Sequence, residues 1–308
     1  MCIKIRTFAV ALLAVAVAGC GAGGNGSGGG SAAPSSGAGV STNPAPAVQK
    51  DEALAKLVPS DVASDGKIVV GSDASYAPNE FVDKDGTTII GMDVDLGKAV
   101  GQKLGLEVEF QNSAFDGILP GIAAKKYELG MSSFTDNAER EKVVDMVTYF
   151  TAGTKMATVK GNPDGLNIDD LCGKTIAVQR GTVQVDDLTA RSEKCTAAGK
   201  PAINQQPFQA QTDVTLALTG KRAQGMLADS PVVDYAVAQT NGQLEVVGEA
   251  YDTAPYGIAV PKNSGDYAKA VQGAVQALMT DGTYKAILDK WSVASGAITE
   301  SKINGAAG

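Results

Sequence analysis

Three segments of the sequence place polar side chains where ligand-binding chemistry is expected, directly after predicted strands. In the first, Asp73 and Tyr76 follow the apolar run at 67–71. The Asp73 carboxylate can accept hydrogen bonds from an ammonium or an amide, and the Tyr76 ring can stack on an aliphatic chain. The same pattern suits an Asx turn with a surface tyrosine, and this segment taken alone favours that simpler interpretation.

The second segment, 132–142, combines hydroxyl side chains with a run of charges. Its arginine, Arg140, carries a planar guanidinium that can grip a carboxylate through two parallel hydrogen bonds. A run such as Glu-Arg-Glu-Lys at 139–142 is more often a solvated charge cluster at the start of a helix. Both interpretations stay open at this point.

The third segment, Gln179–Val183 (Gln-Arg-Gly-Thr-Val), follows a predicted strand at 175–178. A glycine turn that leads into a helix leaves backbone N–H groups free at the positive end of the helix dipole. This arrangement favours an anion such as the α-carboxylate of an amino acid. It is not a phosphate-binding loop, because the Gly-Lys-Ser/Thr signature is missing, and a plain strand-to-helix turn remains the alternative.

The composition argues against several classes of function. The 308 residues contain no histidine, which removes Ser-His-Asp and Cys-His catalysis together with histidine-based metal sites. The formal net charge is −8, so binding to the phosphates of a nucleic acid is not expected. We therefore expect no catalytic residues of these kinds, no metal, no cofactor and no nucleic-acid partner.

The first 19 residues have the pattern of a secretory signal. Lys4 and Arg6 precede an apolar run at 8–18 that is too short to span a bilayer. The run ends in Val-Ala-Gly-Cys20, which resembles a bacterial lipobox, with ordinary signal cleavage as the alternative. We expect a signal peptide over 1–19, a lipid such as palmitate on Cys20, and a protein outside the cytoplasm that this lipid alone holds to the cell membrane.

A flexible linker is expected at 20–50. Residues 21–46 are mainly Gly, Ser, Ala and Pro, and they include no charged or aromatic side chain. Such a segment cannot bury enough apolar surface to offset the entropy lost on ordering. It would hold the folded part near the membrane without restricting its orientation.

The cysteines predict one disulfide. Cys2 leaves with the signal peptide and Cys20 is assigned to lipid, so Cys172 and Cys195 remain. An even pair in an exported protein favours a disulfide over a reactive thiol.

The folded part alternates between short strands and helices, which predicts α/β layers with mostly parallel sheets. The predicted strands lie at 67–71, 106–110, 128–132, 144–150, 174–178, 224–228, 244–248 and 256–260. The predicted helices lie at 93–104, 118–125, 212–219, 231–239, 267–279 and 283–291. Asp93 suits the N-cap of the first helix. Ligands in such sheets bind beyond the carboxyl ends of the strands.

Two motifs resemble the family 3 solute-binding proteins, which are the polar amino acid receptors of ABC importers. The first is Gly91-Met-Asp-Val-Asp-Leu96, followed by Val100-Gly101 and Leu104. The second is the tail at 278–291, which resembles the closing helix pair of the family. The resemblance implies a two-lobed, periplasmic-binding-protein-like fold in which two crossover strands form a hinge.

The resemblance also implies the limits of the lobes. Lobe 1 would comprise 67–150 plus 256–297, and lobe 2 would comprise 153–251. The two crossings would lie near 149–153 and 251–256.

Ten residues match or lie beside ligand-binding positions of the family. They are Asp73, Tyr76, Phe115, Ser133, Thr135, Arg140, Gln179, Thr182, Val183 and Asp229. The resemblance implies that Asp73 contacts the ligand side chain, which the rings of Tyr76 and Phe115 would sandwich. Gln179 lies at a second-lobe position that can face the same side chain.

The remaining six residues would bind the α-substituents of an amino acid. Arg140 and the N–H groups of Thr182 and Val183 match the carboxylate site, and Asp229 matches the aspartate that pairs with the ammonium. Ser133 and Thr135 lie in a segment that meets both groups. An N-cap before a helix is the alternative role for Asp229.

The implied function is that of a monomeric receptor that hands an amino acid to the membrane subunits of an ABC importer. Asp73 and Gln179 offer no cation to the ligand side chain, which favours a neutral polar or basic amino acid unless Arg180 turns inward. One alternative is a lyase of the same fold, such as a cyclohexadienyl dehydratase. Glu80 or Glu128 would then have to act as acid or base, although a surface role is expected for both. A cell-surface sensor is a third possibility.

Overall fold

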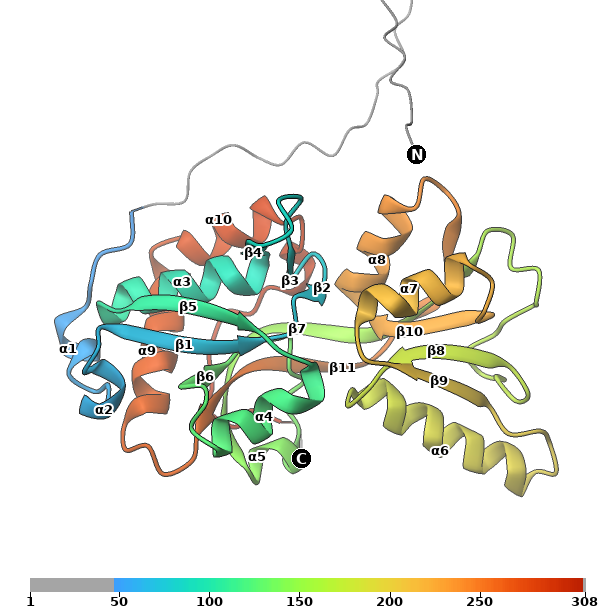
Figure 1. Cartoon of the computed structure of the whole chain (residues 1–308), viewed down its shortest axis with the longest axis horizontal. Coiled ribbons are helices and arrows are strands. Elements are labelled where there is room, and N and C mark those ends of the chain that lie inside the picture. The colour runs from blue at the N-terminus through green and yellow to red at the C-terminus, as the bar shows by residue number, and fades with distance from the viewer. Residues whose placement is uncertain (1–46, 307–308) are drawn as a thin grey trace, which may run out of the picture. The chain divides into compact units, whose positions relative to one another are not determined.

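The computed structural model describes residues 47–306 (Figure 1). The signal peptide at 1–19, Cys20 and most of the linker at 20–50 lie outside the described residues, so these assignments stay predictions. Within the described part, no helix combines the length and the apolar character needed to cross a bilayer.

An eight-stranded sheet forms the centre, with the strand order β5-β1-β6-β11-β7-β10-β8-β9. Its strands are β1 (Lys67–Ser72), β5 (Glu107–Asn112), β6 (Leu129–Gly130), β7 (Val144–Val159), β8 (Thr175–Gln179), β9 (Asn204–Phe208), β10 (Gly225–Asp229) and β11 (Leu244–Pro261). We call β5, β1 and β6 the first half of the sheet, and β10, β8 and β9 the second half. Pairing within each half is parallel, as the sequence predicted.

Two long antiparallel strands, β7 and β11, run between the halves and join them (Figure 1). β11 pairs with β6 of the first half, and β7 pairs with β10 of the second. Three shorter strands were expected here, at 144–150, 244–248 and 256–260, and this expectation was wrong. The expected crossings at 149–153 and 251–256 fall inside the two continuous strands. The register in which β11 pairs with β7 changes on both sides of Tyr251. The limits of the two lobes stay a prediction.

Helices cover both halves of the sheet (Figure 1). They are α1 (Glu52–Ala55), α2 (Ser60–Ala63), α3 (Met92–Leu104), α4 (Phe115–Ala123), α5 (Ala138–Glu141), α6 (Val183–Ala197), α7 (Gln211–Thr219), α8 (Ser230–Gln239), α9 (Tyr267–Thr280), α10 (Thr283–Lys290) and a 3₁₀ turn at Ala294–Gly296. Apolar side chains of α3 and α9 form one buried cluster against the first half. Separate clusters pack the second half. Each fully buried leucine or valine contributes about 1.5–3 kcal/mol to such a core.

The start of α3 differs from the expectation. Gly91, not Asp93, is the N-cap residue, with a φ of 140° that favours glycine. A Cβ at Gly91 would collide with the backbone carbonyl of Asn79. Asp93 lies in the first turn, and its fully buried carboxylate accepts hydrogen bonds from Ser133 and Tyr149 instead of capping the helix.

A small three-stranded sheet between β1 and α3 was not predicted. It consists of β2 (Ser75–Tyr76), β3 (Glu80–Val82) and β4 (Ile89–Ile90), which pair antiparallel. These strands have two or three residues each, too few for an alternating pattern. The small sheet carries Tyr76 and Glu80 to the centre of the molecule.

The predicted disulfide between Cys172 and Cys195 is confirmed, with the two Cα atoms 5.5 Å apart. It ties the segment before β8 to the last turn of α6. Cys195 is buried in the cluster that packs one face of the second half, and Cys172 lies against that cluster.

Loss of this disulfide should lower the free energy of unfolding by about 3 kcal/mol, because the bond restricts a loop of about 20 residues in the unfolded chain. The test compares wild type with the double variant Cys172→Ala/Cys195→Ala by urea unfolding followed through tryptophan fluorescence. A reductant should bring wild type to the level of the variant and leave the variant unchanged. Equal unfolding midpoints for oxidised wild type and variant would contradict the prediction.

Candidate functional site

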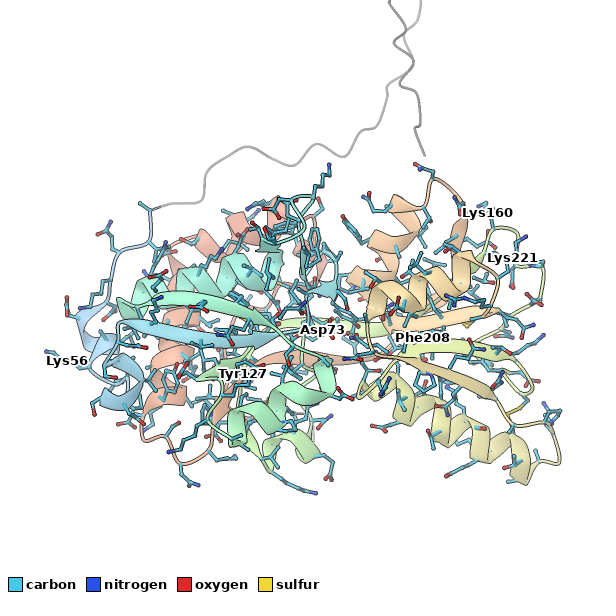
Figure 2. All side chains as sticks on the ribbon, viewed as in Figure 1. Lys56, Asp73, Tyr127, Lys160, Phe208 and Lys221 are labelled. Atoms are coloured by element: carbon cyan, nitrogen blue, oxygen red, sulfur yellow. A yellow bond between two sulfur atoms is a disulfide. The ribbon has the colours of Figure 1, made fainter. Side chains whose placement is uncertain are left out.

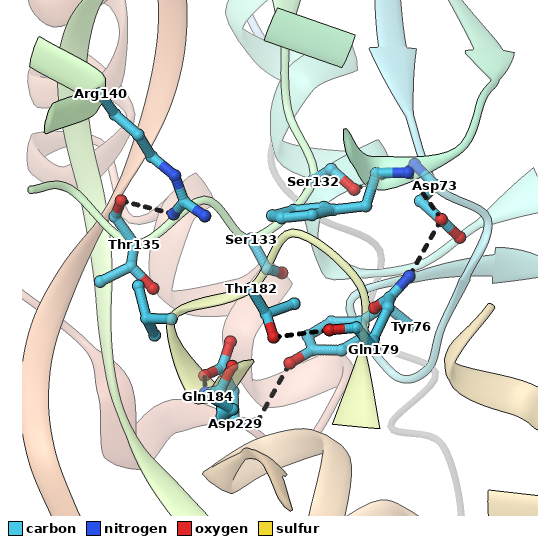
Figure 3. A pocket seen from close by; sticks show the side chains of 12 residues that line it. Asp73, Tyr76, Ser132, Ser133, Thr135, Arg140, Gln179, Thr182, Gln184 and Asp229 are labelled. Carbon is cyan, nitrogen blue, oxygen red and sulfur yellow. Dashed lines mark hydrogen bonds between the residues drawn. The ribbon is translucent and has the colours of Figure 1, made fainter. Parts of the chain in front are cut away.

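The ten residues predicted as ligand contacts come together in one pocket (Figure 3). The lining consists of Asp73, Tyr76, Phe115, Ser132, Ser133, Thr135, Arg140, Gln179, Thr182, Val183, Gln184 and Asp229. Two of the twelve, Ser132 and Gln184, were not predicted. Contact of these residues with a ligand stays a prediction.

The carboxyl ends of parallel strands position most of this lining. In the first half, Asp73 follows β1 directly, and Ser132 and Ser133 follow β6. In the second half, Gln179 ends β8 and Asp229 ends β10. Asp73 lies in the region where the two halves meet (Figure 2). The pocket therefore lies at the position that the α/β topology favours for ligands, with walls from both halves.

Asp73 is a buried carboxylate, 5% exposed, that only neutral groups contact. Its Oδ1 accepts from the Ser75 hydroxyl at 2.6 Å, and its Oδ2 accepts from the Phe115 N–H and the Gln179 side-chain amide, both at 3.0 Å. Burial raises the pKa of Asp73, and these donors only partly oppose that shift. A cation beside Asp73 would stabilise its ionised form.

Asp229 is a second buried carboxylate, 7% exposed. It occupies the N-cap position of α8, yet its side chain makes no capping hydrogen bond. Its oxygens instead accept from the Gln184 amide and the Tyr256 hydroxyl, each at 2.7 Å. Burial raises the pKa of Asp229 as well. The simple capping role considered for Asp229 therefore does not account for its contacts.

Arg140 supplies the positive charge of the pocket. Its guanidinium donates to the backbone carbonyls of Thr135 at 2.7 Å and Gly181 at 3.3 Å. It also lies 5.4 Å from the ring centroids of Phe115 and Phe134, which stack on each other at 4.6 Å. Burial lowers the pKa of Arg140, with Asp229 as the largest opposing influence. A solvated charge run is therefore wrong for Arg140, although Glu139 beside it is exposed.

These three side chains are the only charged groups in the lining, and they give the pocket a net charge of 1 − 2 = −1. Within 47–306, none of them forms an ion pair with another side chain. In the view of Figure 3 they lie at three separate sides of the pocket. The arrangement suits a ligand that brings two positive groups and one negative group.

Backbone N–H groups add to the positive side. Thr182 is the N-cap residue of α6 and Val183 its first residue, so their N–H groups have no acceptor inside the helix. The Thr182 hydroxyl donates to the Gln179 carbonyl at 2.8 Å, which fixes the turn. This helix start lies across from Arg140, whose guanidinium reaches Gly181. The two features together can surround a carboxylate.

The two lining residues that were not predicted, Ser132 and Gln184, are each adjacent in sequence to a predicted one. Ser132 precedes Ser133 and accepts a hydrogen bond from the Asp73 N–H at 2.9 Å. Gln184 follows Val183 in the first turn of α6 and connects Asp229 with Thr154. A rule that includes the first turn of a helix after a strand would have found Gln184.

Three further residues considered for the site, Arg180, Glu80 and Glu128, lie outside the pocket lining. Arg180 is exposed and does not line the pocket, so it does not turn inward. The surface role expected for Glu80 is wrong, because its side chain is fully buried behind the pocket wall. Glu128 is half-buried elsewhere and accepts from the Val69 N–H. Among the described residues, no group of three potential ligands is placed to hold a metal ion.

Comparisons with known proteins agree with this architecture. Residues 68–294 match the family of bacterial extracellular solute-binding proteins, family 3. The arginine-binding protein ArgT of Corynebacterium glutamicum is 36% identical over 263 residues, which cover 85% of this chain and 84% of ArgT.

The solved structures that are 32% identical to this chain include the following two. An ancestral arginine-binding protein bound to arginine has a TM-score of 0.68, covering 73% of this chain and 98% of its own. An ancestral amino acid-binding protein described as a precursor of cyclohexadienyl dehydratase has a TM-score of 0.65, covering 75% and 97%. The motifs, the α/β topology and the pocket at the strand ends lead to the same conclusion: this chain belongs to the family 3 bacterial extracellular solute-binding proteins.

Proposed function

We propose that the chain binds a basic amino acid, with arginine as the best fit, and delivers it to an ABC importer. As a member of its family the chain is an amino acid-binding receptor, and the proposal adds the class of ligand and the contacts. Relatives that are named for arginine binding support the ligand class. The observation that carries the proposal is the charge pattern of the pocket, with two buried carboxylates and one guanidinium.

The charges of arginine match this pattern group by group. Asp73 would pair with the guanidinium of the ligand, and Asp229 with its α-ammonium. Arg140 would bind the α-carboxylate together with the N–H groups of Thr182 and Val183. An acidic ligand would place a second carboxylate near Asp73, where no cation of the pocket lies to balance it.

Binding would also hold the two halves of the sheet together. Asp73 and Arg140 belong to the part built on the first half, whereas Asp229 and the start of α6 belong to the second. A ligand that contacts both parts favours the arrangement in which they face each other over the one in which they lie apart. The free-energy difference between the two arrangements shifts by the difference between the ligand's binding free energies for them. This is the hinge motion that the family resemblance implies.

The lyase alternative has less support. Neither carboxyl group considered for it lines the pocket, since Glu80 lies behind the wall and Glu128 elsewhere. The similarity to a precursor of cyclohexadienyl dehydratase concerns an amino acid-binding protein. Recovery of unchanged arginine after incubation with the protein would agree with a receptor, and a new product would contradict it.

We further propose that the receptor is monomeric and is anchored outside the cytoplasm by a lipid on Cys20. The lipobox and the Gly/Ser-rich linker support the anchor. Cys20→Ser should abolish incorporation of radiolabelled palmitate and release the protein from the membrane fraction, with Cys2→Ser as the matched control that changes neither. Equal labelling of wild type and Cys20→Ser would contradict the anchor.

Replacement of Asp73 by asparagine should lower the affinity for arginine at least tenfold, because it removes a desolvated charge-assisted contact worth about 1.5–3 kcal/mol. Isothermal titration calorimetry with arginine, lysine, glutamine and glutamate measures the effect. Wild type should prefer the basic amino acids and bind glutamate weakest.

The matched control is Asp116→Asn. Asp116 is exposed and outside the lining, yet its charge is near enough to raise the pKa of Asp73. Its replacement should leave the arginine affinity within about threefold, as expected for an exposed charge. An unchanged affinity in Asp73→Asn, or a preference of wild type for glutamate, would refute the assignment of Asp73.

Replacement of Arg140 by alanine should lower the affinity for arginine about 10- to 100-fold, because it removes the charge-assisted contact with the α-carboxylate of the ligand. Agmatine, which is arginine without that carboxylate, should bind wild type more weakly than arginine and should lose nothing in Arg140→Ala. Arg180→Ala is the control, because Arg180 lies near the pocket but is exposed. Equal losses for arginine and agmatine would show that Arg140 does not bind the carboxylate.

A further inference from the structure

Behind the wall of the pocket, two carboxyl groups approach the same hydroxyl: Ser133 Oγ lies 3.2 Å from an oxygen of Glu80 and 3.5 Å from an oxygen of Asp93. They are near enough to influence each other's ionisation. Glu80 comes from β3 and Asp93 from α3, and both side chains are 0% exposed. Neither forms an ion pair with a described lysine or arginine. Two ionised carboxylates this near each other at a buried site repel each other strongly, so such a pair retains one proton between its members.

The pair accepts hydrogen bonds from the pocket wall. The two oxygens of Glu80 accept from the hydroxyls of Ser132 at 2.9 Å and Ser133 at 3.2 Å. Asp93 accepts from the Ser133 N–H at 2.8 Å. Because the Ser132 hydroxyl also accepts from the Asp73 N–H, the connection extends to the carboxylate assigned to the ligand side chain.

Ser133 needs this support because its backbone is in an unfavourable conformation. Its φ is +52°, in the left-handed region that residues other than glycine rarely adopt. Such conformations persist where surrounding contacts hold them. Besides the acid pair, the contacts of Ser133 include the side-chain amide of Asn79, which donates to its hydroxyl at 2.9 Å.

We propose that Glu80 and Asp93 are positioning residues of the binding site, and that the proton they share keeps Ser132 and Ser133 in the geometry that ligand binding requires. The proposal rests on the proposed function, since it concerns the same pocket. Neither residue touches the ligand space, because neither lines the pocket. They act through the two serines and through the N–H of Asp73.

Among the described residues, no lysine or arginine lies within ion-pair distance of the pair, so none replaces the proton. The titratable groups that face it are Asp73 after β1, Tyr76 on β2 and Tyr149 on β7. The Tyr149 hydroxyl donates to both oxygens of Asp93 at 2.8 Å. In agreement with a retained proton, burial raises the pKa of Glu80 well above its usual value and that of Asp93 to about 6.

Two substitutions of Glu80 separate positioning from charge. Glu80→Gln keeps the size of the side chain and offers Asp93 an N–H in place of the shared proton. The affinity for arginine, measured by calorimetry at pH 7, should stay within about threefold of wild type. Glu80→Ala removes both acceptors of the serine hydroxyls, and the affinity should fall about 10- to 100-fold.

Glu128 provides the matched controls. It is a half-buried glutamate that accepts from a backbone N–H of β1 and lies outside the lining. Glu128→Gln and Glu128→Ala should both bind arginine within about threefold of wild type, whatever they do to stability.

A second readout detects the proton without any ligand. A carboxyl group whose pKa is higher in the folded than in the unfolded protein makes the free energy of unfolding fall as pH rises between the two values. For Glu80 this fall begins near pH 4.5 and continues upward to its raised pKa. Urea unfolding between pH 4.5 and 8 should therefore give a shallower decline for Glu80→Gln than for wild type.

The outcomes are distinguishable. Wild-type affinity in Glu80→Ala would overturn the positioning role, and equal losses in Glu80→Gln and Glu80→Ala would overturn the shared proton. An unchanged pH slope in Glu80→Gln would also overturn the shared proton, and this measurement does not require Glu80→Ala to fold. If wild type binds no arginine, the proposed function fails by itself, while the pH slope still tests the pair.

Discussion

The pocket depends on three charges, the buried Asp73 and Asp229 and the half-buried Arg140, none of which has a counter-ion among residues 47–306. Asp73, Asp229 and Arg140 each lose hydration, and each is contacted by neutral donors or acceptors. Burying a charge in this way costs free energy that the fold must supply elsewhere. A ligand that brings the complementary charges into the same space would recover part of that cost. In this account the unfavourable burial of charge in the free receptor is the source of its selectivity.

The architecture explains how these charges reach one place. The carboxyl end of β1 in the first half and the carboxyl ends of β8 and β10 in the second half, whose strands run in the opposite direction, all lie at the pocket and bring Asp73, Gln179 and Asp229 there. Arg140 comes from the short helix α5. The long strands β7 and β11 connect the two halves, and the helices supply the cores that support each half. Neutral groups then orient the charges, as Gln184 and Tyr256 do for Asp229. The buried acid pair of Glu80 and Asp93 does the same for the serines of the wall.

Much of this was predictable from local sequence patterns, and the failures have a common cause. The sequence pattern predicted the helices α3 and α9, and it placed Asp73 and Gln179 at the ends of predicted strands. The full set of ten pocket residues came from the resemblance to the family. The continuous β7 and β11 were missed because their pairing is non-local. The burial of Glu80 was missed because it depends on contacts with Ser132 and Ser133, which are more than fifty residues away. Asp93 resembles a helix cap in sequence, and only the folded chain brings it to Ser133.

The most direct test of the charge match compares arginine with citrulline by isothermal titration calorimetry at pH 7.5. Citrulline has nearly the same size and shape, but a neutral urea group replaces the guanidinium. If a buried, ionised Asp73 selects the ligand, arginine should bind at least tenfold more tightly, a difference of about 1.4 kcal/mol or more. Equal affinities for the two amino acids would contradict the account.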